Sequence, residues 1–255
     1  MNTSSLRNTV YALILLIVPS TATAADYWEK LERDEIKSII ENTPEGTAPD
    51  LKQKDFRGQD MSGFDFGGAK LFYSHFRGVN LAGANFENAN LDLAIMLEAN
   101  LENANLRNAE LNNTGLDDAN LKNADLSGAR VVAKMNRANL EGANMAGMQA
   151  GVSMHNQSMG MIRTELDSAN LKNTNLEGVD LAYCTMRFGK LQNSNLKNAN
   201  LSFCDLSGAD FTGADLSGAN LSETKLTNTR FSNIKGKDTI TGLDTARDRH
   251  LASFD

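Results

Sequence analysis

One large apolar residue recurs at every fifth position from residue 56 onward. A first run of such residues extends to Val131, and a second run resumes at Met161 and continues to Phe231. Between the runs, four residues keep the spacing in a phase one residue earlier: Met135, Leu140, Met145 and Ala150. A small side chain, most often Ala, stands two residues before most of them. The period matches neither a helix, at about 3.6 residues, nor a strand, at about 2. It therefore predicts a backbone that turns once per repeat and points both side chains inward.

The repeat has a recognisable sequence motif. Ala99-Asn100-Leu101-Glu102-Asn103 and Ala214-Asp215-Leu216-Ser217-Gly218 both read A-[DN]-L-x-x. Over residues 51 to about 235, the chain resembles the pentapeptide-repeat family in this motif. The resemblance implies an all-β solenoid, a right-handed quadrilateral parallel β-helix with four pentapeptides, hence 20 residues, in each coil. The phase change makes residues 131–161 the one irregular stretch of the predicted β-helix.

This coil length predicts which residues stack. Inside the rod, one column should contain Phe56, Phe76, Met96 and Leu116, and another Phe66, Phe86, Leu106 and Leu126. Outside, Asn80, Asn100 and Asn120 should form a ladder. Tyr183 and Phe203 are also one coil apart, so we expect them to stack as a small aromatic patch on the surface.

Both ends of such a rod need a cap, because a stack of coils leaves unpaired backbone at each end. Residues 25–50 are predicted to form an N-terminal helical cap and linker, with Asp26 and Glu29 as a capping box. Residues 236–255 are predicted to form a C-terminal cap or tail, in which Asp244 to Phe254 form a short helix. In proteins of the family that the chain resembles, a C-terminal element often mediates dimers, so a homodimer is an open expectation.

The first 24 residues have the features of a secretory signal peptide. Arg7 precedes the apolar run Val10–Val18, and Ala22-Thr23-Ala24 matches a signal peptidase site. The run is too short for a membrane span, which needs about 20 residues. We therefore expect cleavage after Ala24 and no stable membrane insertion of the mature chain. An exported protein is predicted, with the periplasm as the best match and the thylakoid lumen or the extracellular space as alternatives.

The charge distribution argues against a mimic of duplex DNA, which is the role of some acidic proteins of this fold. Residues 51–235 contain 18 Lys and Arg against 20 Asp and Glu, a net charge of −2. Duplex DNA carries about one negative charge per 1.7 Å. We therefore expect no nucleic-acid partner and no imitation of one.

No enzyme site is predicted from the sequence. The three histidines, His75, His155 and His250, lie far apart, and no nucleophile–base pair or phosphate-binding loop is present. Charges on such a repeat surface are most often simply solvated. The function class that fits is a non-enzymatic exported scaffold, structural or protein-binding, with an unidentified protein partner.

The two cysteines are predicted to lie over one another. Cys184 and Cys204 both replace the small inward residue and are one coil apart. One interpretation is a pair of small buried thiols that take the place of Ala. The alternative is a disulfide, since an exported protein meets an oxidising compartment. The Cα spacing of about 4.8 Å suits a disulfide, although parallel Cβ directions would strain it.

The irregular stretch offers one candidate metal site. It is rich in methionine and contains His155, and thioether and imidazole ligands suit Cu(I). The candidate ligands are Met148, Met154, His155 and Met159. The alternative is that methionine fills a core disturbed by the phase change, and no other cofactor is expected.

Overall fold

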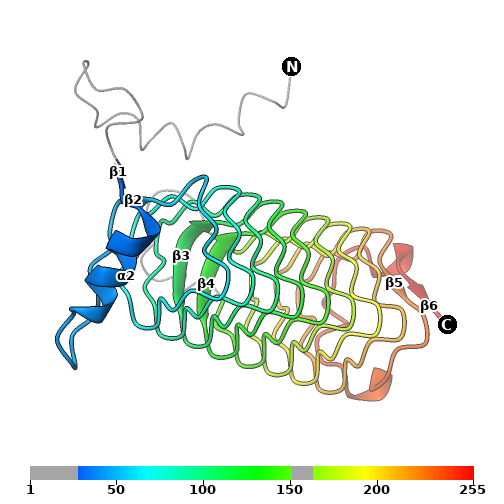
Figure 1. Ribbon diagram of the computed structural model, residues 1–255. Coiled ribbons are helices and arrows are strands. Elements are labelled where there is room, and N and C mark those ends of the chain that lie inside the picture. Colours follow the sequence, from blue (N-terminus) through cyan, green and yellow to red (C-terminus); the bar gives the residue numbers. More distant parts are fainter. Residues whose placement is uncertain (1–27, 151–162) are drawn as a thin grey trace, which may run out of the picture.

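The backbone winds into a rod of stacked, four-sided coils (Figure 1). The computed structural model describes residues 28–150 and 163–255. Over most of the rod, parallel bridges join residues 20 positions apart, as between Asp60 and Asn80 and between Asn80 and Asn100. Because one side of a coil takes five residues, this offset gives four sides. The prediction of a quadrilateral parallel β-helix is confirmed.

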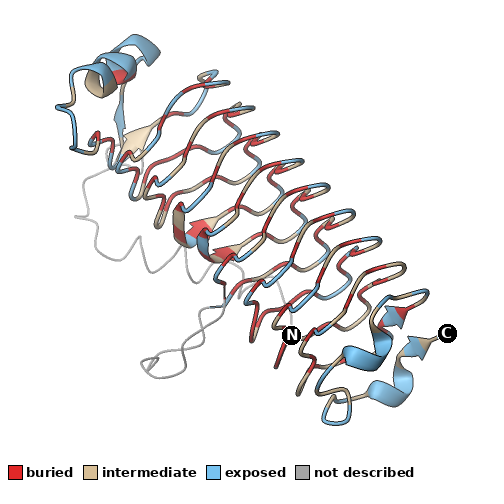
Figure 2. Cartoon of the chain, turned by 90° about the horizontal axis from the view of Figure 1, so that it is seen from below, coloured by how far each residue is buried: buried red, intermediate tan, exposed pale blue. Residues whose placement is uncertain are grey.

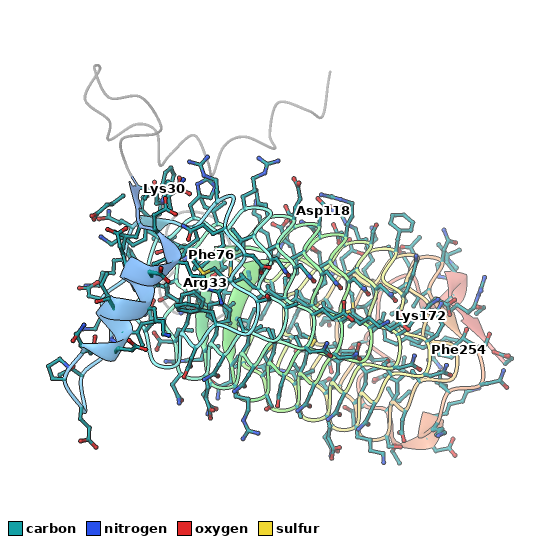
Figure 3. The ribbon with its side chains drawn as sticks, viewed as in Figure 1. Lys30, Arg33, Phe76, Asp118, Lys172 and Phe254 are labelled. Carbon is teal, nitrogen blue, oxygen red and sulfur yellow. The ribbon has the colours of Figure 1, made fainter. Side chains whose placement is uncertain are left out.

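The repeated apolar residues form one continuous core along the rod axis. Every described centre of the repeat, with Leu51 as an additional one, is fully buried. Figure 2 shows the buried positions as red segments that recur along every coil, and Figure 3 shows Asp118 on the outside of the rod. The predicted inner columns are confirmed: the rings of Phe56 and Phe76 stack with centroids 4.2 Å apart, and those of Phe66 and Phe86 at 5.0 Å. Each buried Leu or Phe contributes about 1.5–3 kcal/mol relative to an exposed one.

Nearly every described corner of a coil is a β-turn with a left-handed residue. In the turn from Leu81 to Ala84, the Ala84 amide donates to the Leu81 carbonyl at 3.0 Å, and Gly83 has a φ of +66°. Gly and Asn tolerate positive φ better than other residues do. This local requirement explains why the chain has so many of both at the second position after each centre.

The register changes in the middle of the rod, where β3 (Glu110–Gly115) pairs with β4 (Arg130–Lys134). Bridges across this coil have an offset of 19, as between Asn120 and Asn139, so one side is a residue shorter, as expected near Val131. The next offset is 31 rather than 20, as between Lys134 and Glu165, so 11 residues more than a coil are accommodated. The inserted residues fall between Ala150 and Thr164. Met161, predicted to begin the second run, lies outside the described residues.

The N-terminal cap combines a strand and a helix. Strand β1 (Glu29–Lys30) pairs in parallel with β2 (Lys54–Asp55) at the edge of the first coil, and α2 (Arg33–Glu41) follows. Ile36 is buried, and Leu31, Ile39 and Ile40 pack against the core.

The predicted capping box at Asp26 and Glu29 is wrong. Glu29 lies in β1, and the helix begins after Glu32, whose amide donates to Glu35 Oε2 at 2.7 Å. The edge of the first coil needs a backbone partner, and pairing residues 29 and 30 with it moves the helix start downstream.

The C-terminal cap is a wider coil rather than the helix predicted for Asp244 to Phe254. Bridge offsets grow by one at each side: Asp215 to Lys235, Asn220 to Thr241, Lys225 to Arg247 and Arg230 to Ser253. The coil contains the 3₁₀ turns η4 (Lys237–Thr239) and η5 (Arg249–Leu251), and it closes where β5 (Arg230–Phe231) pairs with β6 (Ser253–Phe254). Phe254 stacks on Phe231 at 4.8 Å.

A six-residue side prevents this segment from forming a helix, because its backbone bonds are made to the coil below. Two of its left-handed corners, Gly236 and Gly242, also demand glycine. At Gly242, with a φ of +76°, an added Cβ would lie 2.4 Å from the Ser222 nitrogen.

Candidate partner-binding surface

The sides of the rod differ in the residues that they turn to solvent. One bridged column, which we call the asparagine face, contains Asp60, Asn80, Asn100, Asn120, Asn139, Asn170, Lys190, Asp210 and Arg230. The next column around the coil, which we call the variable face, contains no asparagine; it consists of Asp55, His75, Ile95, Gly115, Lys134, Glu165, Thr185, Asp205, Lys225 and Arg247.

Side-chain amides on the asparagine face bond from coil to coil, as predicted. Asn100 Nδ2 donates to Asn80 Oδ1 at 3.0 Å, and Asn120 Nδ2 donates to Asn100 Oδ1 at 3.0 Å. The Asn100 oxygen also accepts the Glu102 amide at 3.3 Å. These groups bond within the rod and rigidify its wall, so this face offers few free polar groups to a partner.

A partly exposed aromatic pair lies at one edge of the variable face. Tyr183 and Phe203 occupy the same corner in successive coils, and their rings stack with centroids 4.6 Å apart and planes within 3°. The predicted aromatic patch is confirmed. Phe203 is 44% exposed, while Thr185 and Ser202 beside the pair are buried. The pair is therefore a flat apolar platform that is open to solvent.

Charged residues surround this platform. A hollow of about 320 Å³ is lined by Arg163, Tyr183, Phe203, Asp205, Lys225 and Arg247. Among the described residues, none of the three cations forms an ion pair; Arg247 Nη2 donates to the Glu223 carbonyl at 3.3 Å. Asp205 accepts bonds from the amide and hydroxyl of Ser207. The hollow thus combines an aromatic surface with an excess of positive charge.

The backbone of the pair is in a conformation that suits other residues better. Tyr183 and Phe203 have φ values of +66° and +62°. Positive φ is uncommon outside Gly, Asn and Asp, and for a bulky side chain it is an outlier. Most described corners use Gly or Asn, as at Asn173 and Asn193. Other corners also have a bulky residue at positive φ, as at Leu93, so the feature that marks the pair as a candidate site is the stacking of two aromatic rings at such corners.

A further aromatic corner lies on the next edge of the same side. Phe188 also has a positive φ, +57°, and is 66% exposed, the largest value among the described large hydrophobic residues. Its ring lies over Gly208, where an added Cβ would come within 2.6 Å of Phe188 Cδ1. The exposed aromatic residues of this region therefore flank one side of the rod.

The two cysteines lie in the core directly behind the platform. Cys184 and Cys204 are both buried and are present as free thiols, and Cys204 Sγ donates to the Leu181 carbonyl at 2.9 Å. Burial raises the pKa of the Cys184 thiol, and the neighbouring Cys204 raises it further. The structure shows stacked thiols in the positions of small core residues; the disulfide stays a prediction for oxidising conditions.

The candidate copper ligands are not brought together within the described chain. Met148 is fully buried in the core, two residues before the small centre Ala150, so that large and small side chains exchange places there. Met154, His155 and Met159 lie outside the described residues, and the copper hypothesis stays a prediction. Among the described residues, no three His, Cys, Asp or Glu side chains gather as a metal site, and no helix has the length and apolarity for a membrane span.

At the N-terminal end of the variable face, the chain covers its own aromatic corner. The Trp28 ring lies 5.3 Å from the Tyr73 ring and 4.8 Å from the His75 ring, and its Nε1 donates to the Tyr73 carbonyl at 2.7 Å. Burial and, to a smaller extent, nearby Arg57 lower the pKa of His75 to about 4, while Asp55 opposes the shift.

Sequence reasoning found the aromatic pair but not its cations. Lys225 and Arg247 become neighbours through a bridge with an offset of 22, and Arg163 follows the insertion. Reading the outward column coil by coil would have exposed the absence of asparagine, which is the signal that distinguishes this face.

Comparisons with known proteins agree with this architecture. The family model for pentapeptide repeats matches residues 50–131 and 161–233, in eight copies. The crystal structure of HetL from the cyanobacterium Nostoc sp. strain PCC 7120, a pentapeptide repeat protein involved in heterocyst differentiation regulation, is similar at 27% identity and a TM-score of 0.58. The similarity covers 80% of this chain and 82% of HetL.

A second solved structure shares the fold alone. QnrB1, a plasmid-mediated fluoroquinolone resistance protein, is 19% identical with a TM-score of 0.51, over 74% of this chain and 91% of QnrB1. No curated protein matches the chain. Pentapeptide repeat proteins fold as right-handed quadrilateral β-helices, which is the handedness that the sequence motif implied. With its repeats matched over more than half of its length and its core built from them, the chain belongs to the pentapeptide-repeat family.

Proposed function

We propose that this protein is a non-enzymatic scaffold that binds a partner protein on its variable face. The observation that carries the proposal is the stacked pair of half-buried Tyr183 and exposed Phe203, at corners whose backbone suits Asn or Gly. Aromatic residues and Arg are the residue types that dominate binding energy in protein interfaces. The hollow beside the pair supplies both.

The rest of the molecule supports a binding role. The asparagine face and the core account for the rigidity of the rod, and neither needs the aromatic corners. HetL, which is similar in fold at 27% identity, is involved in heterocyst differentiation regulation, and a binding role is compatible with this.

We also propose that the protein is exported after cleavage behind Ala24, with the periplasm as its compartment. The apolar run Val10–Val18 and the Ala22-Thr23-Ala24 motif support this. Amino-terminal sequencing of the protein from a fractionated host should give a chain that starts at Ala25. A chain that starts at Met1 and stays with the cytosol would contradict the export proposal.

The binding proposal is tested by face-dependent capture. Purified wild type, the double variant Tyr183→Asn/Phe203→Asn and the control Phe72→Asn are immobilised and exposed to extract of the host compartment. Phe72 is 40% exposed and lies several coils away, beside Tyr73 near the N-terminal end of the rod, so it matches the loss of an exposed ring. A partner should be retained by wild type and the control and lost from the double variant. Equal retention by all three proteins would overturn the proposal.

A further inference from the structure

We infer that the partner presents an acidic segment with an aromatic side chain, whose ring packs on Tyr183 and Phe203 while its carboxylates meet Arg163, Lys225 and Arg247. The inference rests on the proposed function and names the chemistry of the partner. It follows from two independent features of the hollow, its aromatic floor and its charge.

The aromatic part of the inference has a precedent within the molecule. Tyr73 occupies the same corner column as Tyr183, two coils from the N-terminal end, and there an indole covers it. Trp28 packs between Tyr73 and His75, and its nitrogen donates to the corner carbonyl. The corner and the adjoining wall can therefore seat an aromatic ring from an extended segment. At Tyr183 and Phe203 no described residue provides such a ring.

The platform is also better suited to a ring than the covered corner is. Two stacked rings form a longer flat surface than Tyr73 alone, and aromatic rings attract one another beyond the effect of the area that they bury. A third ring would lie in the hollow, where the cations can also contact its face.

The charge part of the inference comes from the unpaired cations. Arg163, Lys225 and Arg247 line the hollow with a single carboxylate, Asp205, which already accepts bonds from Ser207. Some cations elsewhere along the rod are paired with described carboxylates, as Arg187 is with Asp167 and Arg137 with Asp118. What sets the hollow apart is that three cations gather around one carboxylate. Guanidinium groups bind carboxylates in bidentate, charge-assisted pairs. Acidic side chains on the partner would satisfy these groups.

A nucleic acid fits the same hollow less well. Binding to a phosphate backbone uses a line of cations that follows the strand. Here the outward column interrupts the cations with Glu165 and Asp205, so the positive charge is confined to one patch. The hollow therefore suits a segment of a protein better than a nucleic acid, and the test below includes an oligonucleotide.

The test is selection from a displayed library of random peptides on the intact mature protein. The same library is selected on Tyr183→Asn/Phe203→Asn, on Lys225→Gln/Arg247→Gln, and on the control Lys190→Gln of the asparagine face. Peptides enriched on wild type and on the control should contain Trp, Tyr or Phe together with Asp or Glu. A synthesised winner should bind either double variant about tenfold more weakly or worse, by fluorescence anisotropy.

Four outcomes would overturn the inference. Enriched peptides could be basic or lack aromatic residues, or they could bind all variants alike. Enrichment could appear only after residues 151–162 are replaced by a short Gly-Ser linker, which would mean that the chain itself occupies the pair. A labelled single-stranded oligonucleotide could bind in place of peptides with the same dependence on the variants.

The failure of the inference is distinguishable from that of the proposed function. A partner captured in a face-dependent way, combined with neutral or basic selected peptides, would refute the acidic aromatic segment and leave the scaffold function standing. Equal capture by all proteins with no enriched peptide would refute both. Circular dichroism melting of every variant confirms that a loss of binding is not a loss of fold.

Discussion

The asparagine face and the variable face are built on the same core, yet they differ in almost every outward residue. On the first, Asn80, Asn100 and Asn120 repeat one hydrogen-bonding unit from coil to coil. On the second, the equivalent positions change from acidic to basic to apolar along the rod. Parallel backbone bridges join the coils on both faces. The outward side chains therefore do not determine the backbone conformation of the coils.

The comparison separates stability from recognition in this fold. A side that only has to stack can repeat the residue that satisfies its own backbone and its neighbours. A side that departs from this repeat loses those bonds, as the variable face loses the amide ladder. The departure is greatest around Tyr183, Phe203 and the hollow beside them, and that is where we place the partner.

The largest effect should come from the core that the two faces share. Lysine in place of Leu121, beneath the asparagine face, or in place of Leu116, beneath the variable face, would bury an unpaired charge. Either change should lower the free energy of unfolding by about 4 kcal/mol or more, as measured by urea denaturation. The exposed corner change Asn108→Lys should cost only about 1 kcal/mol, which reflects its left-handed backbone. A large difference between the two core variants would show that the faces do not share one cooperative core.

The next effect concerns pH and is confined to the variable face. His75 is neutral in the folded protein because its pKa is lowered to about 4, against 6.5 in the unfolded chain. As the pH falls, the unfolded chain therefore binds this proton before the folded chain does. The stability that neutral His75 contributes is present above pH 6.5 and is lost as the pH falls toward 4. The loss in the free energy of unfolding approaches about 3 kcal/mol for the N-terminal cap, which packs on His75 through Trp28. The urea midpoint should fall less over this range in His75→Leu; identical pH profiles would contradict the assignment.

A smaller effect is expected from the amide ladder. Asn120 donates to Asn100, and its oxygen accepts the Lys122 amide and Asn139 Nδ2. Asn120→Ala should reduce the free energy of unfolding by about 1–2 kcal/mol, because two neighbouring amides lose a partner. Thr185→Ala, at the equivalent column position of the variable face, should cost less, since no side-chain ladder passes through it. Equal losses would remove the distinction between the faces.

The smallest effect on stability should follow from Tyr183→Asn/Phe203→Asn. The change removes a stacked pair worth about 0.5–1.5 kcal/mol and relieves left-handed strain of about 1–2 kcal/mol at each corner. The melting temperature should therefore stay near that of wild type or rise, while partner binding is lost. A marked fall in melting temperature, with partner binding retained, would make the pair a structural element and weaken the binding proposal.

The regular part of the fold was accessible from spacing alone. The five-residue period identified the inward centres, and the 20-residue coil placed Phe56 over Phe76 and Tyr183 over Phe203. The structures of the two caps were harder to predict from the sequence, because their backbone conformation is determined by hydrogen bonds to the first and last coils. Glu29 pairs with Lys54 instead of capping a helix, and the last coil follows a six-residue spacing that local helix signals concealed.

The candidate site shows the same division. Its aromatic pair is a property of the repeat, because two residues one coil apart must stack. Its cations come from three coils whose offsets are altered by the insertion after Ala150 and by the widened cap. Spacing in the sequence therefore did not place Arg163 or Arg247 beside Phe203.

By itself, the sequence determined the core, the corners and the ladders, because each of these is a local rule repeated many times. A large residue every fifth position must be buried, and a Gly or Asn after it allows the chain to turn. Only the tertiary structure decided the features that depart from the five-residue repeat. These are the strand that covers the first coil, the widening of the last coil, and the unpaired charges that lie beside the aromatic platform. Those features depend on contacts between residues far apart in the chain, and the register that brings them together exists only once the coils have stacked.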